Sequence, residues 1–178
     1  MTISFEPFYK RFQRLASTET RSLTILNGND FNLPADKYTL LELYCNDKNC
    51  DCQRVIFDVI SEKHNELVAV VAYGWESQEF YYKWFGGSDR SIASLAVKEM
   101  HGITLNSGSQ QSKLAPAILE VVRWALKDQA YVDRLKRHYQ IFKENVEAKR
   151  FREPIAVKPA VGSVSRHSKR HHPRSNDD

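Results

Sequence analysis

The chain has 178 residues, of which 42% are hydrophobic and 11% aromatic, as is typical of a folded globular protein. This length suits one domain with short extensions. The formal net charge is +4, but residues 147–178 hold eight Lys or Arg against four Asp or Glu, which leaves residues 1–146 balanced at 18 and 18. A basic face for nucleic acid over the whole domain is therefore not indicated.

The sequence contains no membrane or secretion signal that we can identify. No segment approaches the roughly 18 consecutive apolar residues of a membrane helix. The start, MTISFEPFYKRFQRL, carries charges throughout and lacks the apolar stretch of a secretory signal. The three cysteines cannot form a closed set of disulfides, which agrees with a reducing compartment. We therefore expect a soluble, cytoplasmic protein without membrane partners.

Residues 1–37 are interpreted as an N-terminal extension with one helix and one strand. Apolar residues at helical spacing between positions 8 and 15 predict a short amphipathic helix. The segment 21–30, RSLTILNGND, alternates weakly and ends in Asn-Gly, which is typical of a strand that runs into a turn.

Three segments with strand character follow, at 38–45, 54–61 and 67–75. They are rich in Val, Ile, Phe and Tyr, which favour a pleated surface. The two links between them are short enough to be hairpins. The simplest interpretation is an antiparallel meander of three to four strands.

After these strands the apolar period becomes helical. Helices are predicted at 76–87, at 88–102, from an N-cap at Ser112, and from a second cap at Asp128. Strands first and helices afterwards indicate the α+β class, with the meander followed by packed C-terminal helices. We assign this core to residues 38–150.

Residues 151–178 replace apolar periodicity with prolines, serines and charges. We predict a disordered basic tail. Two interpretations of this tail stay open. It is either a solvated chain end or a segment that contacts nucleic acid weakly and nonspecifically, with an affinity that falls as salt rises.

All three cysteines lie within the eight positions 45–52, in the sequence YCNDKNCDC. Cys50 and Cys52 would share one face of an extended strand, and a hairpin turn after Cys45 would bring the third sulfur opposite them. Zn²⁺ stabilises such an arrangement, with Zn–S distances of ~2.3 Å. We predict a zinc site. The alternatives are free buried thiols and a Cys-x-Cys redox pair, and the redox pair lacks the helix N-terminus that lowers a thiol pKa.

A tetrahedral zinc site needs a fourth ligand. His101, at a predicted helix end, is the first candidate, and His138, beside the apolar face of the last helix, is the alternative. His64 lies in the opposite turn and ranks last. Asp47, Asp51 or a water molecule are further options, and a water would allow metal-assisted hydrolysis.

No catalytic motif accompanies the cysteines. G-x-S-x-G, the Walker loop, H-E-x-x-H and the Rossmann glycines are absent from the sequence. The string HNE at 64–66 differs from the zinc deaminase signature, because in those enzymes the cysteine pair follows the histidine. The aromatic residues of 75–85 are interpreted as closing the core beside the sheet, in preference to stacking on bases.

We therefore predict a zinc-binding protein that is not an enzyme, in which a structural metal at the hairpin presents a surface for a protein partner. The alternatives are a metal-dependent hydrolase with water as the fourth ligand and a nucleic-acid accessory protein that uses the basic tail.

Residues 38 to about 145, with ELYCNDKNCDCQRV, YGW, FYYKW and RHYQIFK, resemble an uncharacterised family of bacterial proteins. That family shows a YC-x4-CDC-x-RV hairpin and has no assigned activity. The resemblance implies a thiol-rich hairpin that looks like a metal site. The SEC-C zinc motif ends in a C-C or H-C pair that this sequence lacks, so its ligands and partners are not carried over.

Overall fold

The computed structural model describes residues 4–86 and 90–148, and the tail predicted at 151–178 lies outside these ranges. The elements in chain order are β1 (Phe5–Pro7), the 3-10 helix η1 (Phe8–Lys10), α1 (Gln13–Glu19), β2 (Arg21–Ile25), β3 (Asp36–Cys45), β4 (Arg54–Ser61), β5 (Glu66–Gly74), α2 (Gln78–Trp84), α3 (Arg90–Met100), β6 (Gly102–Leu105), α4 (Ala115–Ala125) and α5 (Gln129–Ala148). None of the helices within the described ranges is long and apolar enough to cross a membrane.

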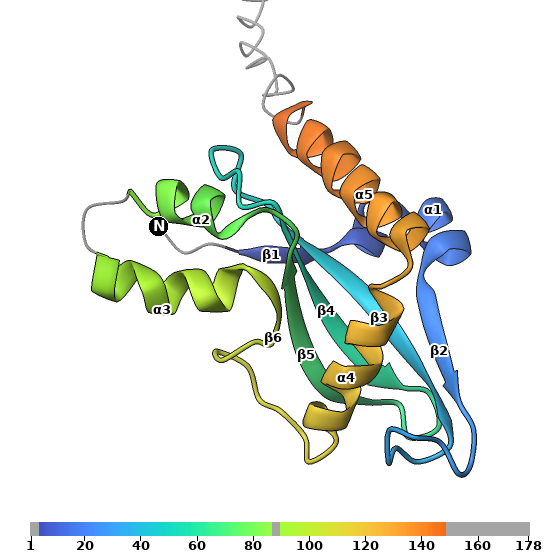
Figure 1. Ribbon diagram of the computed structural model, residues 1–178. Helices are drawn as coiled ribbons and strands as arrows, with labels where there is room; N and C mark the ends of the chain where they lie inside the picture. Colours follow the sequence, from blue (N-terminus) through green and yellow to red (C-terminus); the bar gives the residue numbers. More distant parts are fainter. Residues whose placement is uncertain (1–3, 87–89, 149–178) are drawn as a thin grey trace, which may run out of the picture.

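One antiparallel sheet of six strands forms the centre of the molecule (Figure 1). Its order is β1-β3-β4-β5-β6, and β2 pairs with the first half of β3 while β1 pairs with its last residues. The predicted meander is β3-β4-β5, so the α+β prediction is confirmed. The sheet is larger than the predicted three to four strands, because β1, β2 and β6 extend it. The boundary predicted after residue 37 stays a prediction, although β1 and β2 belong to the same sheet as the core.

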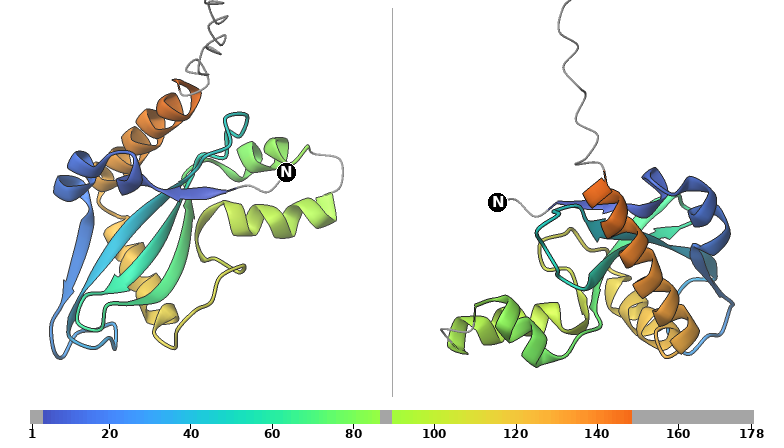
Figure 2. Two further views of the ribbon diagram at one scale, coloured as in Figure 1. Left: turned by 180° about the vertical axis from the view of Figure 1, so that it is seen from behind. Right: turned by 90° about the horizontal axis from the view of Figure 1, so that it is seen from above.

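Helices α4 and α5 cover one face of this sheet (Figure 2). Alternate residues of the strands and one stripe of each helix are buried between these two layers, as their apolar periods require. The largest buried side chains of this layer are Tyr38, Leu40, Tyr44, Phe57, Ile118, Tyr131, Leu135, Tyr139 and Phe142. Helices α2 and α3 pack against each other beyond the end of β5 (Figure 1).

The helix caps test the predicted starts of α4 and α5. Asp128 Oδ1 accepts a hydrogen bond from the backbone N–H of Ala130 at 3.1 Å, so the predicted cap of α5 is confirmed. The predicted cap of α4 is wrong, because the N-cap is Leu114 and not Ser112. The Ser112 hydroxyl accepts from the N–H of Leu114 at 3.1 Å and donates to the carbonyl of Val68 at 2.5 Å. This residue therefore ties the loop before α4 to β5.

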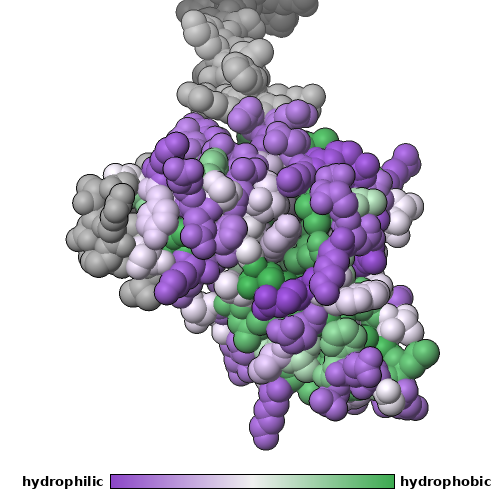
Figure 3. All heavy atoms as spheres, in the orientation of Figure 1, coloured by the Kyte–Doolittle hydropathy of each residue, from purple (hydrophilic) through white to green (hydrophobic). Residues whose placement is uncertain are grey.

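Most of the visible surface is polar, with an apolar area toward α4 and the lower end of β2 (Figure 3). Leu26 and Trp124 are its most exposed large side chains, at 71% and 56%. A groove of about 370 Å³ separates β2 from α4 at this point.

A buried histidine between two carboxylates joins three elements of the fold. The Nδ1 atom of His138, on α5, lies 2.6 Å from Oε2 of Glu42 on β3, and its Nε2 atom lies 2.9 Å from Oε2 of Glu19 on α1. His138 is 1% exposed and Glu42 is 4% exposed. The ring stacks on Phe8 at 4.4 Å between centroids, and the Tyr44 hydroxyl donates to Glu42. The two ring nitrogens thus each face one carboxylate oxygen, while the other oxygen of Glu42, Oε1, is buried and has no hydrogen-bond partner among the described residues.

Substitution of His138 by Leu is expected to lower the free energy of unfolding by about 3–5 kcal/mol, because it leaves the Glu42 carboxylate buried without its nitrogen donor. Urea denaturation followed by circular dichroism measures this change. His64→Leu, in the exposed turn after β4, serves as the control and is expected to change stability by less than about 0.5 kcal/mol. Equal effects of the two substitutions would contradict a structural role for this carboxylate–histidine contact.

Candidate metal centre

The three cysteines lie around a loop, not along a strand. Strand β3 ends at Cys45 and β4 begins at Arg54, so residues 46–53 form the connection. Cys50 and Cys52 belong to this loop, and the prediction that they share a strand face is wrong. The sulfurs are brought together by turns within the loop.

Two local features shape the loop. The Asp47 carboxylate accepts from the N–H of Asn49 at 2.9 Å, and the Asp47 carbonyl accepts from the N–H of Cys50 at 3.1 Å. Asp is favoured at such positions, because its short carboxylate can replace a backbone acceptor in a tight turn. Gln53 then adopts a left-handed φ of 47°, which is uncommon for a residue other than glycine, and turns the chain into β4.

The three sulfurs form a compact group. Within the described ranges, Cys45, Cys50 and Cys52 place their Sγ atoms within 4.8 Å of one another, and all three are free thiols. Their exposed fractions are 0%, 7% and 2%. In a tetrahedral zinc site with Zn–S bonds of ~2.3 Å the sulfurs lie about 3.8 Å apart. The observed spacing is therefore compatible with a bound metal ion.

The loop lies between α2 and α5 (Figure 1). Side chains of these two helices, and Trp75 directly after β5, contact it from both sides. On the α5 side, the Tyr139 hydroxyl donates to Asp51 Oδ1 at 3.1 Å, and the Lys143 ammonium donates to the Asp47 carbonyl. On the other side, the contacts are made to Gln53: the Tyr81 hydroxyl donates to its carbonyl at 2.9 Å and the Trp75 indole to its side chain at 3.1 Å.

Sequence reasoning missed these loop contacts, although it did place the aromatic residues of 75–85 beside the sheet. The sequence feature that could have indicated these contacts is the O–H or N–H group that each Tyr and Trp carries. A Tyr or Trp that is buried normally finds a partner for its O–H or N–H.

Hydrogen bonds among the three thiols give them different pKa values. The hydrogen bond from the Cys52 thiol, with smaller contributions from the Asp47 backbone N–H and the Lys143 charge, lowers the pKa of Cys45 to about 6 despite its burial. The same Cys52 thiol lowers the pKa of Cys50. The pKa of Cys52 itself is raised, because its thiol hydrogen is held by Cys45 and Cys50. The group therefore carries negative charge at neutral pH, as metal ligands require.

Neither predicted histidine belongs to the three-sulfur group. The Nδ1 atom of His101 lies 2.8 Å from the carbonyl oxygen of Glu76, and its ring is 6.5 Å from that of Tyr81. His138 faces carboxylates with both of its nitrogens and is engaged in the core instead. No other His, Asp or Glu of residues 4–86 and 90–148 joins the cysteines in such a group.

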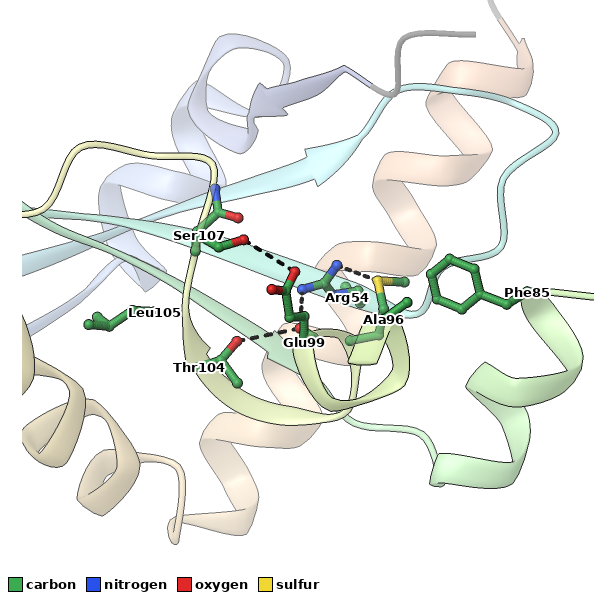
Figure 4. A pocket seen from close by; sticks show the side chains of 9 residues that line it. Arg54, Phe85, Ala96, Glu99, Thr104, Leu105 and Ser107 are labelled. Atoms are coloured by element: carbon green, nitrogen blue, oxygen red, sulfur yellow. Dashed lines mark hydrogen bonds between the residues drawn. The ribbon is translucent and has the colours of Figure 1, made fainter. Parts of the chain in front are cut away.

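Arg54 lies directly after the loop and lines a cavity of about 100 Å³ (Figure 4). Its Nη1 atom lies 2.6 Å from the Met100 sulfur, and its Nη2 donates to the Glu99 carbonyl at 2.9 Å. Burial lowers the pKa of this guanidinium, while the neighbouring Cys52 opposes that shift. The Glu99 carboxylate accepts from the Ser107 hydroxyl at 3.2 Å. The cavity wall thus contains a cation bonded to neutral acceptors.

Comparisons with protein-family models, with curated proteins and with solved structures find no match to this chain. The function proposed below therefore rests on the geometry of this chain alone.

In the metal-free protein, we expect the thiolate absorbance near 240 nm to rise with a midpoint near pH 6, because Cys45 ionises with a pKa of about 6. The pKa of an unfolded thiol is ~8.5, so this ionisation stabilises the folded state. The contribution is complete above about pH 8.5 and is lost as the pH falls through about 6.

The matched variants are Cys45→Ser, in which the step should pass to Cys50, whose pKa the Cys52 thiol also lowers, and Cys52→Ala, which should move the step to higher pH by removing the hydrogen-bond donor. A wild-type titration without any step below pH 8 would show that the sulfurs are not coupled as described.

Proposed function

We propose that the chain binds one zinc ion through Cys45, Cys50 and Cys52, and that the metal holds the 46–53 loop in its folded form. The observation that carries this proposal is the group of three free, buried sulfurs within 4.8 Å of one another. Buried thiolates select soft or borderline metals, and zinc accepts such ligands without redox chemistry. An iron–sulfur cluster normally takes four cysteines, and this chain has three.

The burial of the sulfurs favours a structural role for the metal over a hydrolytic one. Exposed fractions of 7% or less leave no room for a large substrate at the metal, whereas contacts from α2 and α5 bind the loop into the fold. Nucleic-acid contact by the basic tail, a protein partner and a cytoplasmic location stay predictions from the sequence.

The metal content of the purified protein tests the site directly. We expect one zinc per chain in the wild type and less than about 0.1 in the triple variant C45S/C50S/C52S, because serine hydroxyls are poor zinc ligands. Inductively coupled plasma mass spectrometry gives the ratio, and hydrogen exchange should show faster exchange in 46–53 when zinc is removed by a chelator. Wild-type protein that neither contains nor takes up zinc would refute the proposal.

The role predicted for His101 has its own test. Because its ring lies on the Glu76 carbonyl and outside the sulfur group, we expect His101→Ala to keep its full zinc content. Metal analysis beside the triple cysteine variant measures this. Loss of zinc in His101→Ala would instead assign the fourth position to this histidine.

A further inference from the structure

We propose that the metal completes its coordination with a small anion taken up from solution, and that Lys143 and Arg54 create this preference for negative charge. The inference rests on the zinc site proposed above and concerns its fourth position. It is drawn from the charges that surround the three sulfurs.

Lys143 brings a buried positive charge to one side of the loop. It is 9% exposed, and its ammonium donates to the carbonyl of Asp47, whose backbone N–H donates to the Cys45 sulfur. Among the described residues, no carboxylate lies within ion-pair distance of Lys143. A buried ammonium without a carboxylate is costly unless another negative group lies near it. The thiolates of the metal centre are that group.

Arg54 brings a second cation, two positions after Cys52, and the charges of Cys50 and Cys52 act on it. Its Nε atom is buried and has no hydrogen-bond partner in the part of the chain that the structure describes, and its other contacts are the neutral Glu99 carbonyl and Met100 sulfur. Met100 packs in the same buried cluster as the three cysteines. The ion pairs of the described ranges do not include Arg54 either.

Charge counting then favours one kind of fourth ligand. A divalent ion with three thiolates has a net charge of −1, and the two cations contribute +2. A neutral imidazole would leave a positive charge uncompensated in a buried region, whereas a monoanion balances it. The Asp51 and Glu99 carboxylates are on exposed residues, although the Glu99 charge also acts on Arg54, and the Asp47 carboxylate caps the turn at Asn49. Charges that reach water are screened and do not replace a buried partner.

None of the three cysteines lines the cavity beside Arg54, so this cavity is a space next to the metal centre and not the fourth coordination position itself (Figure 4). Its volume of about 100 Å³ suits a molecule of a few heavy atoms, and Thr104 and Ser107 add hydroxyl groups to its wall. Arg54 and Met100 line this cavity, and Met100 also packs in the buried cluster of the three cysteines, so a small anion held here would lie beside that cluster.

The test uses the full-length protein loaded with Co²⁺, whose thiolate charge-transfer bands report the three sulfurs and whose d–d bands report the fourth ligand. Azide and thiocyanate are the anionic probes and imidazole is the neutral one. We expect both anionic probes to shift the d–d bands at lower concentration than imidazole does. Lys143→Met and Arg54→Met should weaken azide binding at least about tenfold and change imidazole binding by less than about twofold.

Lys113→Met removes an exposed lysine before α4 and should leave all affinities unchanged. Lys143→Arg keeps the charge and should retain azide binding. The preference for anions over imidazole is measured on the wild-type protein itself, so it does not depend on the folding of any variant. A preference for imidazole, d–d bands that respond to no probe, or equal azide affinity in Lys143→Met would each overturn the inference. The absence of any charge-transfer band would instead overturn the zinc proposal itself.

Discussion

The free-energy cost of burying charged groups is the main constraint on this structure. Helix α5 carries two such groups, and hydrogen bonds to other elements stabilise both of them. His138 and Lys143 lie five positions apart on this helix and are both almost wholly buried. His138 is held between the carboxylates of Glu42 and Glu19, while Lys143 reaches the turn of the cysteine loop. The contact between His138 and Glu42 is strong because both of its partners are withdrawn from water. One helix therefore fixes both the N-terminal segment and the candidate metal centre.

This arrangement explains how a loop without regular structure can hold three sulfurs in place. The loop makes only short-range turns of its own, at Asp47 and Gln53. Its remaining order comes from the Tyr81 and Trp75 contacts on one side and from α5 on the other. A zinc ion would add a cross-link among residues that are already close, and so would stabilise a preformed loop more than it would create one.

The sequence predicted what is encoded locally. The runs of β-branched and aromatic residues marked β3, β4 and β5, and Asp128 marked the start of α5, because strand patterns and caps involve neighbouring residues. The sequence also predicted that the three cysteines lie together, because they are close neighbours in the chain. Strands β1 and β6, with three and four residues, are too short to show an alternating pattern. The surroundings of His138 and Lys143 depend on partners 96 residues away, and no spacing in the sequence reports such contacts.

The late position of α5 in the chain has a consequence for synthesis on the ribosome. Asp47 of the cysteine loop is translated 96 positions before Lys143, the residue that binds its carbonyl. During that interval the strands of the meander can already pair, since all three precede the helix, while the sulfurs are still open on the α5 side. Metal loading at this stage would need no opening of the finished fold. The order of the elements along the chain thus gives the thiols a period in which they are more accessible than in the finished fold.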